Sequence, residues 1–232
     1  MIGFLRKISK RMAQDDALGK YLLYAVGELL LVVLGILIAL YINNWSESEK
    51  MRRTNTTLLR QLQDENRLNM ADLEDDVAYR DTLDVMLFDF HRFLKKGNLE
   101  LQEAKLRGYL EATLRTSLYT PANENLNKYL TSNLNDNSSL VTELVVLNSY
   151  QQALQDVCNR VLEFKLDRFY QYLSSDVDLY SLEIQTFEKL QSLEFRNNIV
   201  LLESLEESVF TSFENTYDQQ KRIDSLISLT LE

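Results

Sequence analysis

Glu28 is the side chain best placed for chemistry in this 232-residue sequence, because it lies inside an apolar segment. Residues 21–45 read YLLYAVGELLLVVLGILIALYINNW, and Glu28 is the one acidic or basic residue among them. An ionisable group inside a membrane span is costly, so it marks a functional residue by default. Three roles stay open: a protonated carboxyl that bonds subunits together, a carrier on a proton or ion path, and a side chain that extends to the nearer interface.

Small residues share the helical face of Glu28. Counting from Glu28 as i, Val32, Gly35 and Ala39 stand at i+4, i+7 and i+11. Small residues let two backbones approach closely in lipid, where polar side chains then bond across helices. This face therefore predicts helix association in the membrane.

The rest of the sequence offers few groups for catalysis. His91 is the only histidine, so a zinc site or a histidine-activated nucleophile would have one candidate. Asp72, Asp75 and Asp76 share a helical face without the loop geometry of a calcium site, which favours a solvated acidic face. The sequence has no glycine-rich phosphate loop. We expect no enzyme activity, no catalytic residue, no cofactor and no metal site.

The apolar segment is long enough to cross a bilayer. Residues 21–42 would form about 33 Å of helix, which matches a hydrocarbon core of roughly 30 Å. Aromatic residues that prefer the two interfaces stand at its ends: Tyr21, Tyr24, Tyr41 and Trp45. A cleaved signal peptide is the competing interpretation, but the stretch is too long and INNWSES lacks a small-x-small site. We expect a retained transmembrane helix over 21–42.

Residues 1–20 have the composition of a basic, amphipathic tail. Phe4, Leu5, Ile8 and Met12 share one helical face. The basic residues lie mostly elsewhere: Arg6, Lys7, Lys10 and Arg11. Such a helix rests on an anionic cytoplasmic leaflet. Basic residues also follow the span, so the tail decides the orientation: a cytoplasmic amino terminus and an outer domain.

The part of the chain after the span is acidic. The whole chain has a net charge of −10, although its first 20 residues hold more basic than acidic side chains. Nucleic-acid binding depends on neutralising phosphates with cations, so no nucleic-acid partner is expected. The expected partners are the lipid bilayer, further copies of the chain and, in one interpretation, a multi-span membrane protein.

The low content of turn residues predicts an all-α chain, with a single transmembrane helix followed by an elongated bundle of long helices. Gly and Pro number only 6 and 1, and sheets need turn residues that the sequence lacks. Apolar spacing and polar turns place the helices of the ectodomain, residues 43–232. The expected helices cover about 46–96, 100–117, 122–133, 139–173 and 180–230.

The first of these helices has an apolar seam of the coiled-coil type with a polar middle. Its apolar residues are Leu59, Leu62, Leu73, Leu83, Leu87, Phe90 and Leu94. Asn66, Asn69, Asp76 and Arg80 fill the places between, so the middle either pairs with polar partners or frays. Cys158 falls on a later apolar stripe, which indicates a small buried hydrophobe. Such stripes must pack against one another, which gives a bundle.

Two stretches resemble a known family. KYLLYAVGELLLVVLGILIALYINNWSE, preceded by a tail beginning MIGFLRKI, is similar to the amino-terminal signature of a family of uncharacterised single-pass membrane proteins common in Bacteroidota. SLYTPANENLNKYLTSNLNDNSSLVTELVVLNSYQ is similar to the middle segment of that family, with Tyr119, Pro121, Leu126 and Asn137 at matching places. The resemblance implies attachment to the bacterial inner membrane with a periplasmic helical domain. It implies no activity.

These patterns favour a membrane-anchored scaffold or interaction protein that forms a homo- or hetero-oligomer. The alternative is an accessory subunit of an ion-driven or transport complex that uses Glu28 in the membrane. A sensor ectodomain is disfavoured, because 20 cytoplasmic residues leave no room for an output domain.

Overall fold

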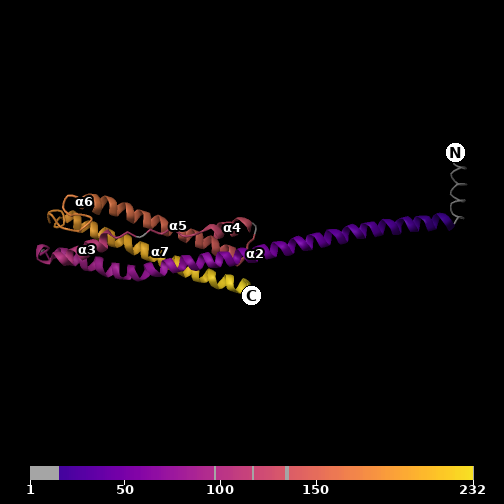
Figure 1. The fold of residues 1–232 in the computed structure, drawn as a ribbon, viewed down its shortest axis with the longest axis horizontal. Coiled ribbons are helices and arrows are strands. Elements are labelled where there is room, and N and C mark those ends of the chain that lie inside the picture. The colour runs from indigo at the N-terminus through magenta and orange to yellow at the C-terminus, as the bar shows by residue number, and fades with distance from the viewer. Residues whose placement is uncertain (1–15, 97, 117, 134–135, 232) are drawn as a thin grey trace, which may run out of the picture. The chain divides into compact units, whose positions relative to one another are not determined.

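The computed structural model describes residues 16–96, 98–116, 118–133 and 136–231, and the side chains of these except 16–21, 23, 75, 78 and 81. The elements in chain order are α2 (Asp16–Lys95), η1 (Glu100–Gln102), α3 (Glu103–Leu114), α4 (Glu124–Ser132), α5 (Ser139–Lys165), η2 (Leu166–Tyr170), α6 (Gln171–Leu173) and α7 (Leu193–Leu231) (Figure 1). Extended pairing within the described ranges is limited to one bridge between Val177 and Ile184. The prediction of an all-α fold with long helices is confirmed.

The chain divides into two units, residues 1–56 and 57–232, and α2 contributes to both. The sequence predicted one helix over 21–42 and another from about 46, whereas α2 has no break between them. The reason is local. The stretch INNWSESE contains no Gly or Pro, the two residues that interrupt a helix most strongly.

The second unit is a bundle in which α5 and α7 pack along each other (Figure 1). Gln219 Nε2 donates to Glu143 Oε2 at 2.8 Å near the start of α5. At the other end of α5, Lys165 Nζ lies 2.8 Å from Glu206 Oε1. A later residue of α5 thus meets an earlier residue of α7, so the two helices run antiparallel.

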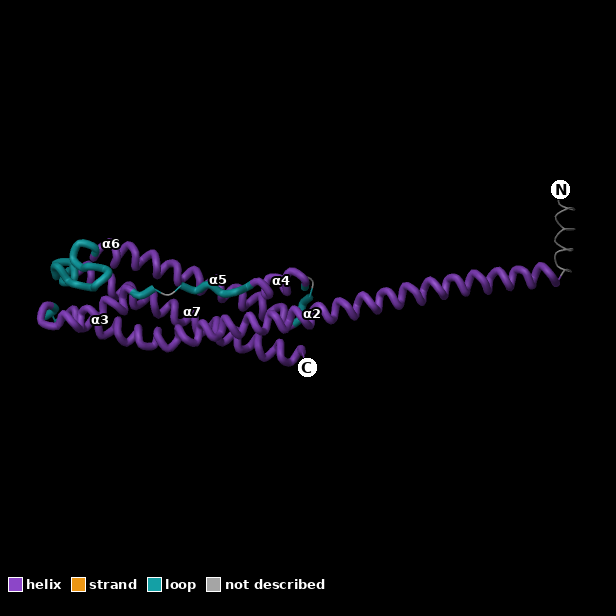
Figure 2. The backbone as a smooth tube through the Cα atoms, in the orientation of Figure 1, coloured by secondary structure: helices purple, strands orange, loops and turns teal. Residues whose placement is uncertain are grey.

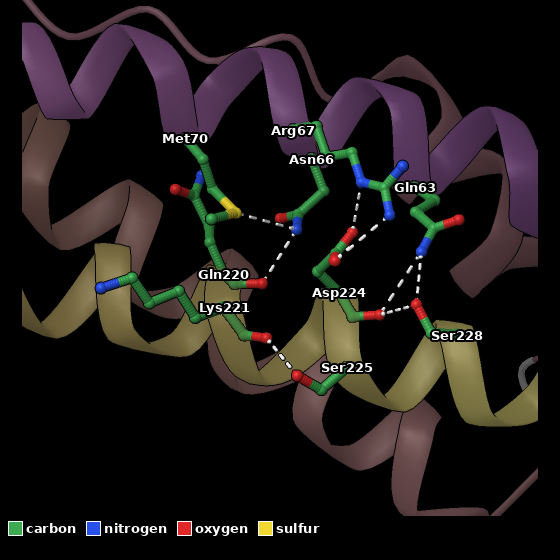
Figure 3. Close-up of polar contacts among 9 residues, drawn as sticks. All are labelled: Gln63, Asn66, Arg67, Met70, Gln220, Lys221, Asp224, Ser225 and Ser228. Carbon is green, nitrogen blue, oxygen red and sulfur yellow. Dashed lines mark hydrogen bonds and ion pairs between the residues drawn. The ribbon is translucent and has the colours of Figure 1, made fainter.

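The bundle part of α2 also runs antiparallel to α7. Three contacts drawn in Figure 3 join the helices: Gln63 Nε2 to Ser228 Oγ, Asn66 Nδ2 to the Gln220 carbonyl, and Arg67 Nε to Asp224 Oδ1. Their lengths are 2.8, 2.9 and 2.8 Å. The Arg67 pair is exposed and contributes little to stability, whereas the Asn66 bond is buried.

Two apolar clusters fill the bundle. The larger one contains Phe90, Phe169, Phe195 and Phe213, all wholly buried. Phe195 packs edge to face against Phe90 and Phe169, with ring centroids 6.0 and 5.8 Å away. The smaller cluster draws on α2, α4, α5 and α7: Leu59, Leu62, Leu126, Tyr129, Leu140, Leu144, Leu147, Ile223 and Ile227.

A layer of buried amides separates the two clusters. Asn66 and Asn69 on α2, Gln151 on α5 and Gln220 on α7 each lie between a residue of one cluster and a residue of the other along the chain. The polar middle of the α2 seam is therefore paired and not frayed. Asn66 bonds α7, and Asn69 exchanges two hydrogen bonds with the backbone of Ala122 at 2.8 and 2.9 Å. Such buried polar contacts favour one register of the helices over others.

A side chain of α2 caps the amino end of α4. The Glu65 carboxylate, in a residue only 7% exposed, accepts hydrogen bonds from the backbone N–H groups of Asn125 at 2.8 Å and Leu126 at 3.0 Å. N–H groups in the first turn of a helix have no acceptor within it. Asn123, at the N-cap position, makes no such bond with its side chain. The carboxylate of Glu65 therefore supplies the missing acceptor and interacts favourably with the helix dipole.

The predicted helices over 100–117 and 139–173 are each divided. The first consists of the short 3-10 turn η1 followed by α3. The second consists of α5, the π-helical turn η2 and the single turn α6. Ser138 begins α5 as a cap, since its Oγ accepts from Val141 N at 3.4 Å. The helix expected over 122–133 corresponds to α4.

The last helix begins at Leu193, not near residue 180 as the sequence predicted. The segment between α6 and α7 is a loop, drawn in teal in Figure 2. The Asp176 side chain fixes this loop, because it is buried and its Oδ2 accepts from Lys189 N at 3.0 Å. The Lys189 Nζ also donates to the Tyr172 carbonyl at 2.6 Å.

Polar side chains set both the turn in this loop and its end. The Asp178 Oδ1 accepts from the backbone N–H of Tyr180 at 2.9 Å, which forms a local turn. Ser192 then caps α7, with its Oγ accepting from Phe195 N at 2.9 Å. In this segment, hydrogen bonds from side chains to the nearby backbone stabilise a loop, although the spacing of the apolar residues predicted a helix.

We expect Glu65→Ala to loosen α4 selectively. The change leaves the N–H groups of Asn125 and Leu126 without their acceptor, which costs about 1–3 kcal/mol. Hydrogen exchange at these two amides should accelerate, and urea unfolding should shift by a similar free energy. Asp64→Ala, at the exposed neighbouring position, is the control. Unchanged protection of Asn125 and Leu126 in Glu65→Ala would contradict the cap.

Candidate functional site

The first unit presents an apolar helix that none of its described residues covers. A helix long and apolar enough to cross a membrane begins, within the described residues, at Tyr24, and none of its most apolar stretch is buried. Every large apolar side chain described between Leu22 and Ile42 is at least 44% exposed. A helix that is apolar on all sides needs an apolar environment, because soluble proteins rarely leave so large an apolar surface in water.

Glu28 lies on this uncovered helix and is itself exposed. It makes no hydrogen bond or ion pair with any residue that the structure describes. At 1.5 Å per residue it stands about 10 Å from Tyr21 and about 21 Å from Ile42, nearer to the amino end of the span. A carboxylate at that depth in hydrocarbon requires a proton, a partner or a path to the interface.

The face that the sequence assigned to helix packing is open. Val32, Gly35 and Ala39 are all exposed. A Cβ atom added at Gly35 would meet nothing within 4 Å beyond the adjacent residues and the surrounding helix backbone. Another helix could therefore approach the backbone closely at this glycine.

The aromatic residues at the two ends of the span are exposed where they are described. Tyr24 is 81%, Tyr41 73% and Trp45 64% exposed. The side chain of Tyr21 lies outside the described residues, as do all four basic tail residues: Arg6, Lys7, Lys10 and Arg11.

The second unit buries three charged side chains together. Arg80 Nη1 on α2 donates to Glu206 Oε2 on α7 at 2.9 Å. Lys165 Nζ on α5 lies 2.8 Å from the other oxygen of the same carboxylate and donates to the Arg115 carbonyl at 2.6 Å. The side chains of Arg80, Lys165 and Glu206 are 3%, 2% and 8% exposed. One carboxylate thus joins three helices.

The electrostatics of this charged cluster point to a packing role. Burial lowers the pKa of the Lys165 ammonium group, and the Glu206 carboxylate works against that change. The Arg80 guanidinium also lies 4.3 Å from the ring centroid of Phe213, a cation–π contact. Buried charges are expensive unless all partners are in place, so the cluster suits the selection of one helix arrangement.

A cavity of about 370 Å³ adjoins the cluster. Its lining is Arg80, Leu83, Asp84, Glu206, Glu207, Phe210, Thr211 and Glu214. This lining holds no nucleophile paired with a base, so we assign no reaction to it. Within the described ranges, no three His, Cys, Asp or Glu side chains gather as a metal site would require. His91 is half-buried on α2, and the side chain of Asp75 lies outside the described residues.

Arg80 stands out in the sequence as a polar residue in the seam of α2, whereas its two partners, Lys165 and Glu206, were not predicted. Lys165 stands four residues after Val161, so it continues the apolar stripe of α5. Glu206 stands four residues after Leu202 and three before Val209 on the stripe of α7. A charged residue at a position of the apolar stripe could have predicted these partners, because charged side chains are buried in a core only when they are paired.

We expect Glu206→Ala to destabilise the bundle by about 3–5 kcal/mol, since it leaves two buried cations without their carboxylate. Urea unfolding measures this loss, and Glu207→Ala is the matched exposed control. Replacing the whole cluster, with Arg80→Met, Lys165→Met and Glu206→Leu, should recover much of the stability. A loss in Glu206→Ala no larger than in the control would contradict the assigned role.

The pH dependence of stability should show the burial of Cys158. Burial raises the pKa of its thiol from 9.0 to about 11. The unfolded thiol therefore loses its proton first, so its contribution is complete below pH 9 and is lost as the pH rises to about 11. The full loss is about 2–3 kcal/mol. Urea unfolding across this range should show a shallower decline for Cys158→Ala, and an identical decline would contradict the prediction.

Comparison with known families gives a match that covers part of the chain. A model described as a family of unknown function, DUF6090, matches residues 28–106. Neither the curated proteins nor the solved structures that were compared gave a match. The matched stretch begins at Glu28, contains Arg80 and ends in α3. Over these residues the chain is similar to a domain family to which no function is assigned.

Proposed function

We propose that this chain is a membrane-anchored helical scaffold or interaction protein, without catalytic activity of its own, that forms a homo- or hetero-oligomer. The uncovered apolar helix of the first unit carries the proposal. Its large side chains from Leu22 to Ile42 are at least 44% exposed, and lipid is the environment that suits them on all sides.

The proposed location is the bacterial inner membrane. Residues 21–42 would span it, with residues 1–20 on the cytoplasmic side and residues 43–232 in the periplasm. The basic composition of residues 1–20 supports this orientation. The resemblance of the amino-terminal segment to single-pass membrane proteins supports the compartment.

Glu28 and the small residues beside it form the proposed contact between spans. The open backbone at Gly35 permits close approach, and a protonated Glu28 carboxyl would bond to a neighbouring chain. The bundle brings a packed apolar interior joined by the Asn66 and Asn69 hydrogen bonds and by the charged cluster, which suits a rigid binding domain.

The second candidate function is an accessory subunit of an ion-driven or transport complex. The observation that favours it is the same carboxylate, because an ionisable group within a span is suited to carry a proton. In that case a multi-span partner would surround Glu28.

We expect Glu28→Leu to weaken the oligomer by about 5- to 30-fold in dissociation constant, because polar contacts between spans contribute about 1–2 kcal/mol. Sedimentation equilibrium in mild detergent measures the change. Glu28→Gln keeps a hydrogen-bonding group and should retain most of the assembly. Leu37→Ala, on the opposite face, is the control.

An oligomer unchanged in Glu28→Leu would refute the contact. If Glu28→Gln assembles with a multi-span partner yet abolishes transport by that partner, the accessory-subunit function is favoured over the scaffold.

A further inference from the structure

A compact group of charged and aromatic side chains follows the apolar segment in the first unit. Trp45, Glu49, Lys50 and Arg53 line one shallow surface hollow of about 300 Å³ together with Ser46. Arg52 adjoins them through Glu49. We call Trp45, Glu49, Lys50, Arg52 and Arg53 the basic collar.

Glu49 organises the two guanidinium groups of the collar. Arg52 Nε and Nη2 donate to its two carboxylate oxygens, each at 3.0 Å, and Arg53 Nε donates to Oε1 at 3.1 Å. These bonds lower the pKa of Glu49 to about 2, so the carboxylate stays ionised. The side chains of Arg52 and Arg53 nevertheless remain 74% and 78% exposed. The arrangement is a pair of cations held side by side and accessible from outside.

With residues 21–42 in the membrane, the backbone of the collar would lie at the outer edge of the lipid headgroups. A tryptophan next to a span prefers the membrane interface, and Trp45 occupies that position. Lys50 and Arg53 follow it by roughly 8 and 12 Å along the helix. The headgroup layer is about 5–7 Å thick on each side of the hydrocarbon core. The Cα atoms of Lys50 and Arg53 would therefore lie a few ångströms beyond the phosphates, at a distance that a long side chain can bridge.

The direction of the side chains closes this gap. In an α-helix the Cα–Cβ bonds tilt towards the amino end, which for α2 is the end that holds the apolar segment. Long basic side chains at the edge of a span thus reach back to the interface. Arginine, with five N–H donors in a planar fork, binds phosphate oxygens in pairs.

We infer that the basic collar binds the phosphate groups of anionic phospholipids in the leaflet on the side of the bundle. The inference rests on the proposed transmembrane anchor. Charge complementarity and continuity with the apolar segment identify the occupant as lipid. Trp45 sets the depth, Glu49 orients the two arginines, and Lys50, Arg52 and Arg53 supply the cations. The collar would thereby fix how far the chain is inserted.

The test uses the full chain in neutral detergent, titrated with phosphatidylglycerol or with phosphatidylcholine and followed by native mass spectrometry. All variants carry glutamine at the four basic tail positions, so that binding by Arg6, Lys7, Lys10 and Arg11 does not contribute. The collar variant adds Lys50→Gln, Arg52→Gln and Arg53→Gln. The control instead adds three exposed changes in the second unit with the same loss of charge: Lys96→Gln, Lys128→Gln and Lys221→Gln.

The starting chain is the one that carries only the four tail substitutions. We expect it and the control to bind phosphatidylglycerol more tightly than phosphatidylcholine. In the collar variant the ratio of the two affinities should fall by about tenfold or more. The preference should shrink at high salt. No preference in the starting chain, or an equal loss in the control, would overturn the inference. A variant with Arg52→Lys and Arg53→Lys keeps the charges but loses the paired guanidinium bonds, so it should keep more of the preference than the collar variant and less than the control. A loss as large as in the collar variant would instead point to a disturbed helix.

Failure of the inference is distinguishable from failure of the proposed anchor. A chain that alkaline carbonate releases from its own membranes is not anchored, and the proposed function then fails. A chain that resists carbonate but binds both lipids equally retains its anchor and refutes the collar alone.

Discussion

The exclusion of water from one apolar helix is the constraint on which the interpretation of the whole chain depends. The first unit exposes large side chains along all of its described apolar segment, and no described residue of that unit covers them. A helix can meet this constraint in a bilayer because its backbone groups bond within the helix itself. The single carboxylate in that segment, Glu28, is then costly in free energy, because it places an ionisable group in hydrocarbon. Such a group indicates a bonding partner or a function.

In the second unit the same helix buries one face against other helices of the chain. Here α2 is one wall of the bundle, and its seam alternates between apolar and polar residues. The apolar places pack into two clusters, and Asn66, Asn69 and Arg80 meet partners on other elements. The hydrogen bonds of Asn66 and Asn69 and the ion pair of Arg80 form in one arrangement of the helices, so stability and specificity come from the same buried groups.

The amino-acid sequence predicts the elements well where one face of a helix is regularly apolar, as on α5 and on α7 after residue 193. It fails between residues 180 and 192, because Asp176, Asp178 and Ser192 bond the nearby backbone and end helical spacing there. Contacts between distant residues, such as Glu65 with α4, leave no local pattern at all. Glu28 and its face could be found from sequence alone, since their signal is a charge in an apolar run, whereas the partners of Arg80 required the fold.

The most direct test is the native mass of the unmodified chain, extracted in mild detergent from its own membranes, with every co-migrating chain identified. A scaffold predicts a chain that needs detergent for extraction and migrates as an oligomer or with a stoichiometric partner. A chain recovered without detergent, or one that migrates alone as a monomer, would contradict the account.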